Sequence, residues 1–125
     1  MTGGSKVQHW IGWTLTLLIS AMMLMSAVMK LLKPDPVVEG FPKMGWDISL
    51  AVPLGIVEIA ATLCFLLPPT AVLGAVLLTG YLGGAIATHV RVGDQFIIPV
   101  ALGVAVWLAL YLRDSRLRSL LPFRN

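Results

Sequence analysis

The sequence predicts an all-α membrane protein, built as an antiparallel bundle of four transmembrane helices. Its 125 residues are 58% hydrophobic and only 12% charged, whereas about 25% of the residues in an average soluble domain are charged. Four apolar segments meet or approach the length of about 20 residues that crosses the hydrocarbon core of a bilayer. Short connections between the later segments place consecutive helices side by side in opposite directions.

The first expected span is too long to be the apolar core of a secretory signal, which has about 7–15 residues, and no A-x-A cleavage site follows it. We therefore expect it to be retained. The last span is short, and Pro99 falls in its first turn, where a missing N–H group costs little. The whole chain is expected to form one domain, residues 1–125. The expected spans cover residues 10–32, 48–67, 71–89 and 96–112.

Two kinds of connection separate the spans. The proline-rich segment 33–47 is expected to be an ordered loop or a short interfacial segment, with Phe41 and Trp46 at the depth of the lipid head groups. Residues 68–70, Pro-Pro-Thr, predict a tight reversal, and residues 91–94 predict a short polar turn. This pattern puts both ends of the chain on one side of the membrane.

The distribution of basic residues favours cytoplasmic termini by the positive-inside rule. The net charge of +3 is interpreted as attraction to anionic lipid head groups, so no nucleic-acid partner is expected. The terminal side carries the α-amino group with Lys6, Arg113, Arg116, Arg118 and Arg124, whereas the other side carries Lys30, Lys33, Lys43 and Arg91.

Small residues recur at four-residue spacing in the last two spans. Such stripes let membrane helices approach closely. Packing inside the bundle is the favoured interpretation, and self-association is the alternative. The stripes are Gly80 with Gly84, Gly83 with Ala87, and Ala101 with Ala105 and Ala109.

Glu58 is an acidic residue in the middle of an apolar segment. At 1.5 Å of rise per residue it lies roughly 15 Å inside the second span, and Tyr81 reaches a similar depth in the third. Lys30 and His89 lie nearer the ends of their spans. An ionisable group inside a membrane normally faces the bundle interior, a partner or a water-filled cavity, so we expect these four side chains to open toward one side.

Each of these side chains has two interpretations. Glu58 is favoured as a residue for ligand contact, proton handling or contact with a partner helix, against a structural hydrogen bond to Tyr81 or Lys30. The Lys30 side chain can instead extend to the interface. Tyr81 can serve packing with one hydrogen bond, and an imidazole such as that of His89 is stabilised by the C-terminal end of a helix.

Several chemistries are excluded by the sequence. Cys64 is the only cysteine, so no intrachain disulfide or thiolate metal site can form. His9 and His89 lie about a membrane thickness apart and cannot share one haem. Phosphate-binding loops, zinc-protease motifs and activated nucleophiles do not occur. No catalytic residue and no metal site are therefore expected, and a quinone is the one cofactor left open.

Three stretches resemble the DoxX-like family of small four-helix membrane proteins over about residues 10–112. They are Lys30-Leu31, "GIVEIAATLCFLLP" at residues 55–68 and "GYLGGAIATHVRVGD" at residues 80–94. The resemblance implies a location in the bacterial inner membrane. It also implies relatives associated with quinone oxidoreductase systems, and animal relatives that help receptors assemble by contacting partner helices. The positions that match the family's recurrent polar pattern are Lys30, Glu58, His89 and Arg91.

Three functions remain open. The first is a non-catalytic accessory subunit or assembly factor whose intramembrane polar pocket binds a partner helix, a lipid or a quinone-like ligand. The second is a quinone-interacting subunit of a membrane oxidoreductase, and the third is a small proton-coupled exporter. The expected partners are the lipid bilayer, a partner membrane protein or a second copy of the chain, and a small hydrophobic ligand. The candidate ligand-binding or proton-handling residues are Lys30, Glu58, Tyr81, His89 and Arg91.

Overall fold

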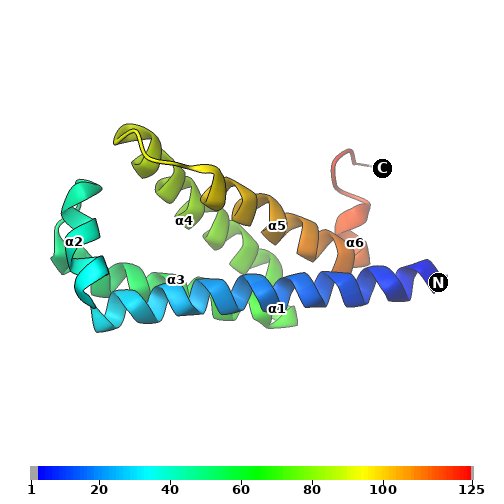
Figure 1. Ribbon diagram of the computed structural model, residues 1–125. Coiled ribbons are helices and arrows are strands. Elements are labelled where there is room, and N and C mark those ends of the chain that lie inside the picture. Colours follow the sequence, from blue (N-terminus) through cyan, green and yellow to red (C-terminus); the bar gives the residue numbers. More distant parts are fainter. Residues whose placement is uncertain (1–2, 125) are drawn as a thin grey trace.

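The computed structural model describes residues 3–124 and is all-helical, with no strand in that range. The chain runs through six α-helices (Figure 1). Short 3-10 turns at Ile48–Leu50 and Pro68–Thr70 precede α3 and α4. The helices are α1 (Gly3–Leu32), α2 (Asp35–Lys43), α3 (Ala51–Leu66), α4 (Ala71–Arg91), α5 (Ile97–Arg113) and α6 (Ser115–Arg118).

The four long helices pack in a ring. Helix α1 contacts α3 and α5, and α4 contacts the same two helices. Helix α1 begins, and α6 ends, at the same end of the molecule (Figure 1). The short helix α2 lies at the opposite end, together with the connection between α4 and α5. The ring buries a core that includes Phe65, Leu78, Val106 and Leu110.

Three segments are long and apolar enough to cross a membrane: Lys6–Leu32, Ile48–Leu66 and Pro68–Arg91. The fourth apolar helix, Ile97–Arg113, has 17 residues and is shorter. All four also carry large apolar side chains on their outer faces, which suits helices surrounded by lipid. Examples of these exposed side chains are Leu17, Leu18, Ile56, Val57, Leu73, Val76, Val104 and Leu108.

The helix boundaries lie close to the expected ones, with two differences. Helix α1 begins at Gly3 and not near residue 10, so it extends beyond its apolar part. The proline-rich segment 33–47 contains the helix α2. Asp35 and Pro36 occupy the first turn of α2, where an acidic side chain and a residue without an N–H group are both favourable.

Glycines make two different kinds of surface in this fold. A Cβ atom added at Gly74 would clash with the backbone of Phe65, and one added at Gly12 would lie 2.7 Å from the nitrogen of Arg113. These positions therefore let neighbouring helices approach closely. Gly80, Gly83 and Gly84 are exposed, and an added Cβ would meet nothing within 4 Å. The expectation that this stripe packs inside the bundle is therefore wrong, because it lies on the outer face of α4.

Candidate functional site

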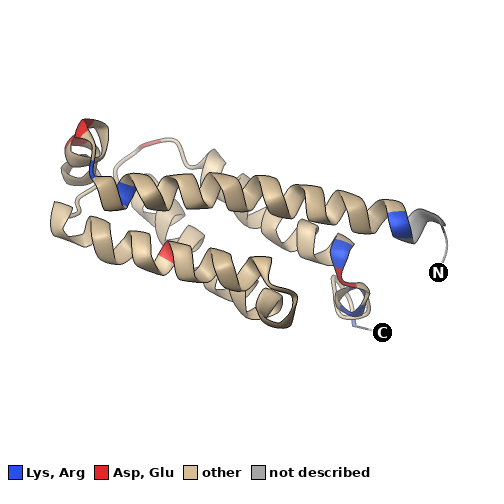
Figure 2. Ribbon diagram, turned by 90° about the horizontal axis from the view of Figure 1, so that it is seen from below, with Lys and Arg blue, Asp and Glu red and all other residues tan. Residues whose placement is uncertain are grey.

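Side chains from three helices meet at Glu58. Helix α3 places this residue at its middle, where Figure 2 shows one acidic turn in an otherwise uncharged helix. Helix α1 contributes Ser26 and Lys30, which are four residues apart and therefore share one face. Helix α4 contributes Tyr81. The Glu58 cluster, as we call these four residues, thus ties together three of the four long helices.

Three hydrogen-bond donors converge on one oxygen of Glu58. Lys30 Nζ donates to Glu58 Oε1 at 3.0 Å, and Tyr81 OH donates to the same atom at 3.0 Å. Ser26 Oγ lies 3.4 Å from Oε1 and accepts a hydrogen bond from Lys30 Nζ at 2.7 Å. The hydrogen bonds to Lys30 and Tyr81, which were the alternative interpretation of Glu58 from the sequence, are therefore both present. Ser26 was not anticipated as part of the cluster.

The cluster is enclosed by protein on the Glu58 side. The Glu58 side chain is 1% exposed and that of Lys30 is 18% exposed. Lys30 Nζ also lies 5.8 Å from the centre of the Tyr81 ring, so this side chain turns inward and does not extend to the interface. Within residues 3–124, Glu58 Oε2 accepts no hydrogen bond. The arrangement thus combines a buried ion pair with one acceptor atom left over.

His89 and Arg91 lie outside the Glu58 cluster, at the end of α4. The Nδ1 atom of His89 lies 2.6 Å from the carbonyl oxygen of Ala85 on its own helix. Arg91 donates to the carbonyl oxygen of Met44 at 2.7 Å and lies 5.5 Å from the centre of the Trp46 ring. Through these contacts, Arg91 holds the segment after α2 against the end of α4.

Replacing Arg91 with Gln is expected to loosen the segment after α2 without unfolding the protein. The lost contacts are exposed, so the free energy of unfolding should fall by about 1 kcal/mol or less. Hydrogen–deuterium exchange should become faster at residues 44–47 and stay unchanged in α3. The exposed Lys43→Gln variant serves as the control. Unchanged exchange at residues 44–47 in Arg91→Gln would contradict the role of this contact.

A second buried polar group, Arg113, was counted from the sequence only as a charge on the terminal side. It is 9% exposed. Its guanidinium donates to Thr16 Oγ1 at 2.8 Å and to the carbonyl oxygen of Phe65. It also lies 4.4 Å from the ring centre of Trp13 and 4.8 Å from that of Phe65. This residue therefore joins α1, α3 and α5 at the end opposite α2.

No group of three or more His, Cys, Asp or Glu side chains within residues 3–124 is arranged to hold a metal ion. Cys64 is free and partly buried. The polar chemistry of the described chain therefore centres on the Glu58 cluster and on the surroundings of Arg113.

The fold and the buried cluster define a multi-pass helical membrane protein with a polar centre between its helices. The model of the DoxX-like family matches residues 14–111, which include all four long helices in whole or in part. The chain therefore belongs to the DoxX-like family. Searches of the curated proteins and of the solved structures found no match to it.

Proposed function

We propose that this protein is a non-catalytic component of the bacterial inner membrane that holds a partner helix, a lipid or a quinone-like ligand at the Glu58 cluster. It would act as an accessory subunit or assembly factor. The observation that carries this proposal is Glu58 itself. It is 1% exposed, its Oε1 atom accepts all the donors of the cluster, and its Oε2 atom accepts none from residues 3–124.

The proposal includes four membrane-spanning helices, α1, α3, α4 and α5, in an antiparallel bundle with cytoplasmic termini. With 17 residues, α5 is roughly 26 Å long, which approaches the about 30 Å of the hydrocarbon core. Figure 2 shows basic residues along the ribbon at both ends of the molecule. Lys30, at the α2 end, is paired with Glu58 inside the bundle, so the balance of Lys and Arg favours the end where α1 begins and supports a cytoplasmic position for it. The α-amino group of Met1 lies outside the described residues.

The ligand should donate a hydrogen bond. Glu58 Oε2 accepts no hydrogen bond from residues 3–124, yet it is not completely enclosed, because Ser20 Oγ is the one fully buried side-chain polar atom without a partner in that range. A donor can therefore approach Oε2, and in a bilayer no water would otherwise satisfy this atom. A hydroxyl group from a lipid, a quinol or a partner helix would satisfy Oε2. The one hydroxyl hydrogen of Tyr81 is already donated to Oε1, whereas Lys30 Nζ donates to Ser26 and Glu58 and has a third N–H group. Lys30 and Glu58 Oε2 therefore present a donor and an acceptor to a ligand.

The second candidate function is a quinone-interacting subunit of a membrane oxidoreductase. The Lys30 donor beside the Glu58 acceptor supports it. A quinone carbonyl accepts hydrogen bonds, whereas the quinol hydroxyl donates them. The third candidate, a proton-coupled exporter, has less support. Lys30 already lies 3.0 Å from the Glu58 carboxylate, so the acid is not isolated.

A partner helix has a second place to approach. Gly80, Gly83 and Gly84 form an exposed strip on α4 that offers no side chain beyond hydrogen. Such strips allow close contact between membrane helices. This strip supports contact with a partner membrane protein or with a second copy of the chain.

Native mass spectrometry in native-lipid discs tests the proposal. Wild-type protein is expected to retain a small molecule or a partner chain, and Glu58→Gln is expected to lose it. Glu39→Gln is the matched control, because Glu39 is an exposed glutamate of α2. The proposal fails if wild type and both variants form the same oligomer and retain no small molecule or partner chain.

A further inference from the structure

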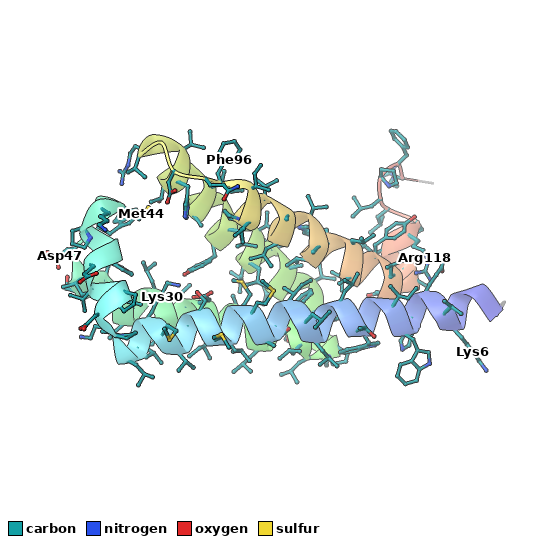
Figure 3. The ribbon with its side chains drawn as sticks, viewed as in Figure 1. Lys6, Lys30, Met44, Asp47, Phe96 and Arg118 are labelled. Atoms are coloured by element: carbon teal, nitrogen blue, oxygen red, sulfur yellow. The ribbon has the colours of Figure 1, made fainter. Side chains whose placement is uncertain are left out.

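A recess with a volume of ≈ 870 Å³ lies at the end of the molecule opposite α2. It is separate from the Glu58 cluster. Its walls come from the start of α1, the start of α4, the end of α5 and α6. Figure 3 labels Lys6 and Arg118 at this end, and Lys30, Met44, Asp47 and Phe96 toward the other. Lys6, Arg113, Arg116 and Arg118 line the recess.

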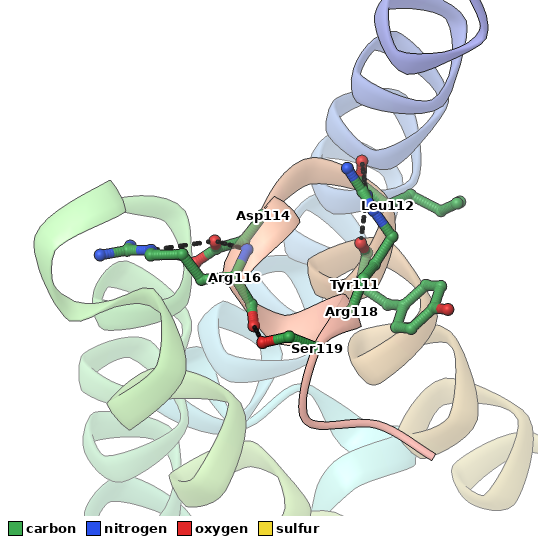
Figure 4. Close-up of polar contacts among 6 residues, drawn as sticks. All are labelled: Tyr111, Leu112, Asp114, Arg116, Arg118 and Ser119. Atoms are coloured by element: carbon green, nitrogen blue, oxygen red, sulfur yellow. Dashed lines mark hydrogen bonds and ion pairs between the residues drawn. The ribbon is translucent and has the colours of Figure 1, made fainter. Parts of the chain in front are cut away.

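Positive charge dominates this recess. The one acidic residue that lines it, Asp114, forms an ion pair with Arg116 at 3.2 Å. The hydrogen bond from the Arg116 guanidinium lowers the pKa of Asp114 below its ordinary value. Arg118 donates to the carbonyl oxygens of Tyr111 and Leu112 (Figure 4). Neither it nor Lys6 has a carboxylate partner within residues 3–124.

Arg113 gives the strongest evidence that the recess binds an anion. Its buried guanidinium contacts only neutral groups: a threonine hydroxyl, a backbone carbonyl and two aromatic rings. Buried charges in proteins are normally paired with an opposite charge. No carboxylate in residues 3–124 lies within ion-pair distance of Arg113, although the charge of the neighbouring Asp114 acts on it from farther away. An anionic group from another molecule would therefore give the buried guanidinium the direct partner that it lacks.

The surroundings of the recess are those of a membrane interface. Trp10 and Trp13 line it from α1, and tryptophan is enriched where helices leave the hydrocarbon core. Leu112 adds partly exposed apolar surface, and the helices around the recess carry exposed apolar side chains. A ligand with both an anionic group and an acyl chain fits this combination better than a free anion does.

We propose that this recess binds the phosphate group of an anionic phospholipid from the leaflet on the terminal side. The Arg113 and Arg118 guanidinium groups and the Lys6 ammonium surround the phosphate, and the acyl chains follow the apolar surface beside α1. Arginine suits this role because its planar guanidinium can make two parallel hydrogen bonds to phosphate oxygens. This site does not depend on any ligand at Glu58.

Titration of the protein in a neutral detergent with phosphatidylglycerol, read by native mass spectrometry, tests the site. The double variant Lys6→Gln/Arg118→Gln removes two of the three cations that surround the phosphate. Circular dichroism checks that its helices stay intact, because Arg118 also donates to the Tyr111 and Leu112 carbonyl oxygens. We expect its affinity for the first bound phosphatidylglycerol to fall at least roughly tenfold, because each basic side chain near an anionic lipid contributes about fivefold. The matched control, Lys33→Gln/Lys43→Gln, removes two exposed cations at the other end and should stay within about twofold of wild type.

Further titrations, with other ligands and with an Arg113 variant, identify the source of the phosphate and the role of Arg113. Phosphatidylcholine, which has the same phosphodiester without net charge, should bind the wild type more weakly than phosphatidylglycerol. Inorganic phosphate at millimolar concentration should not displace the lipid. Arg113→Lys keeps the charge but loses the fork of donors, so it should weaken phosphatidylglycerol and phosphatidylcholine by similar factors, because both carry the same phosphodiester. Equal losses in the two double variants, or full displacement by inorganic phosphate, would overturn the proposal.

Discussion

Replacing Lys30 with Met, or Glu58 with Leu, is expected to lower the free energy of unfolding by about 3 kcal/mol in each case, because each change leaves a buried partner without its counter-charge. The double variant is expected to recover most of this loss, since it removes both charges from an apolar environment. Thermal unfolding in mild detergent, followed by the fluorescence of the four tryptophans, measures all three variants.

An exposed pair of opposite charges on α2 provides the comparison for this double-mutant cycle. Glu39 and Lys43 are four residues apart on α2, and both are exposed. Changing them to Leu and Met should give a coupling of about 0.5 kcal/mol or less. Losses that simply add at Lys30 and Glu58 would mean that the 3.0 Å contact contributes nothing to stability.

The same double variant separates stability from ligand binding. If it folds as well as wild type but carries no small molecule, the loss comes from the missing charged groups of the Glu58 cluster and not from unfolding. If it retains the molecule, Glu58 serves the structure alone. The stable double variant therefore complements Glu58→Gln as a test of ligand binding at the Glu58 cluster.

The depth of each polar residue along its helix was enough to predict that Glu58 and Tyr81 meet at the centre of the candidate site. Glu58 and Tyr81 each lie about ten residues from the same end of the bundle, so their meeting follows from helix geometry. His89 did not join them, although it lies on the same helix as Tyr81. Eight residues along an α-helix turn a side chain by about 80° around the axis and move it by about 12 Å.

Other parts of the site depend on contacts that no local pattern reveals. Thr16, which binds Arg113, is 97 positions away in the chain, so the burial of this arginine could not be seen in its own surroundings. Ser26 did leave a signal, because it lies one helical turn before Lys30. The glycine stripe of α4 had a clear period, but a period alone does not say whether its face meets a neighbouring helix or lipid.

Gly74→Ala is expected to be among the most destabilising single changes outside the Glu58 cluster. The added Cβ would lie 2.5 Å from Phe65 Cα, and backbone atoms at a helix crossing cannot move aside as a flexible side chain would. Helices α3 and α4 would have to separate near the tight reversal at Pro68–Thr70. We expect a loss of about 3 kcal/mol, at the upper end of the range for overpacked sites.

Gly83→Ala is the matched control, because it makes the same chemical change on the same helix. Nothing lies within 4 Å of the added Cβ at this position, and alanine favours a helix over glycine by about 1 kcal/mol. The melting temperature should therefore fall for Gly74→Ala and stay level or rise for Gly83→Ala. A fall at Gly83 that deepens with protein concentration would instead locate a contact between copies of the chain on this face of α4. An unchanged melting temperature at Gly74 would contradict the close approach of α3 and α4.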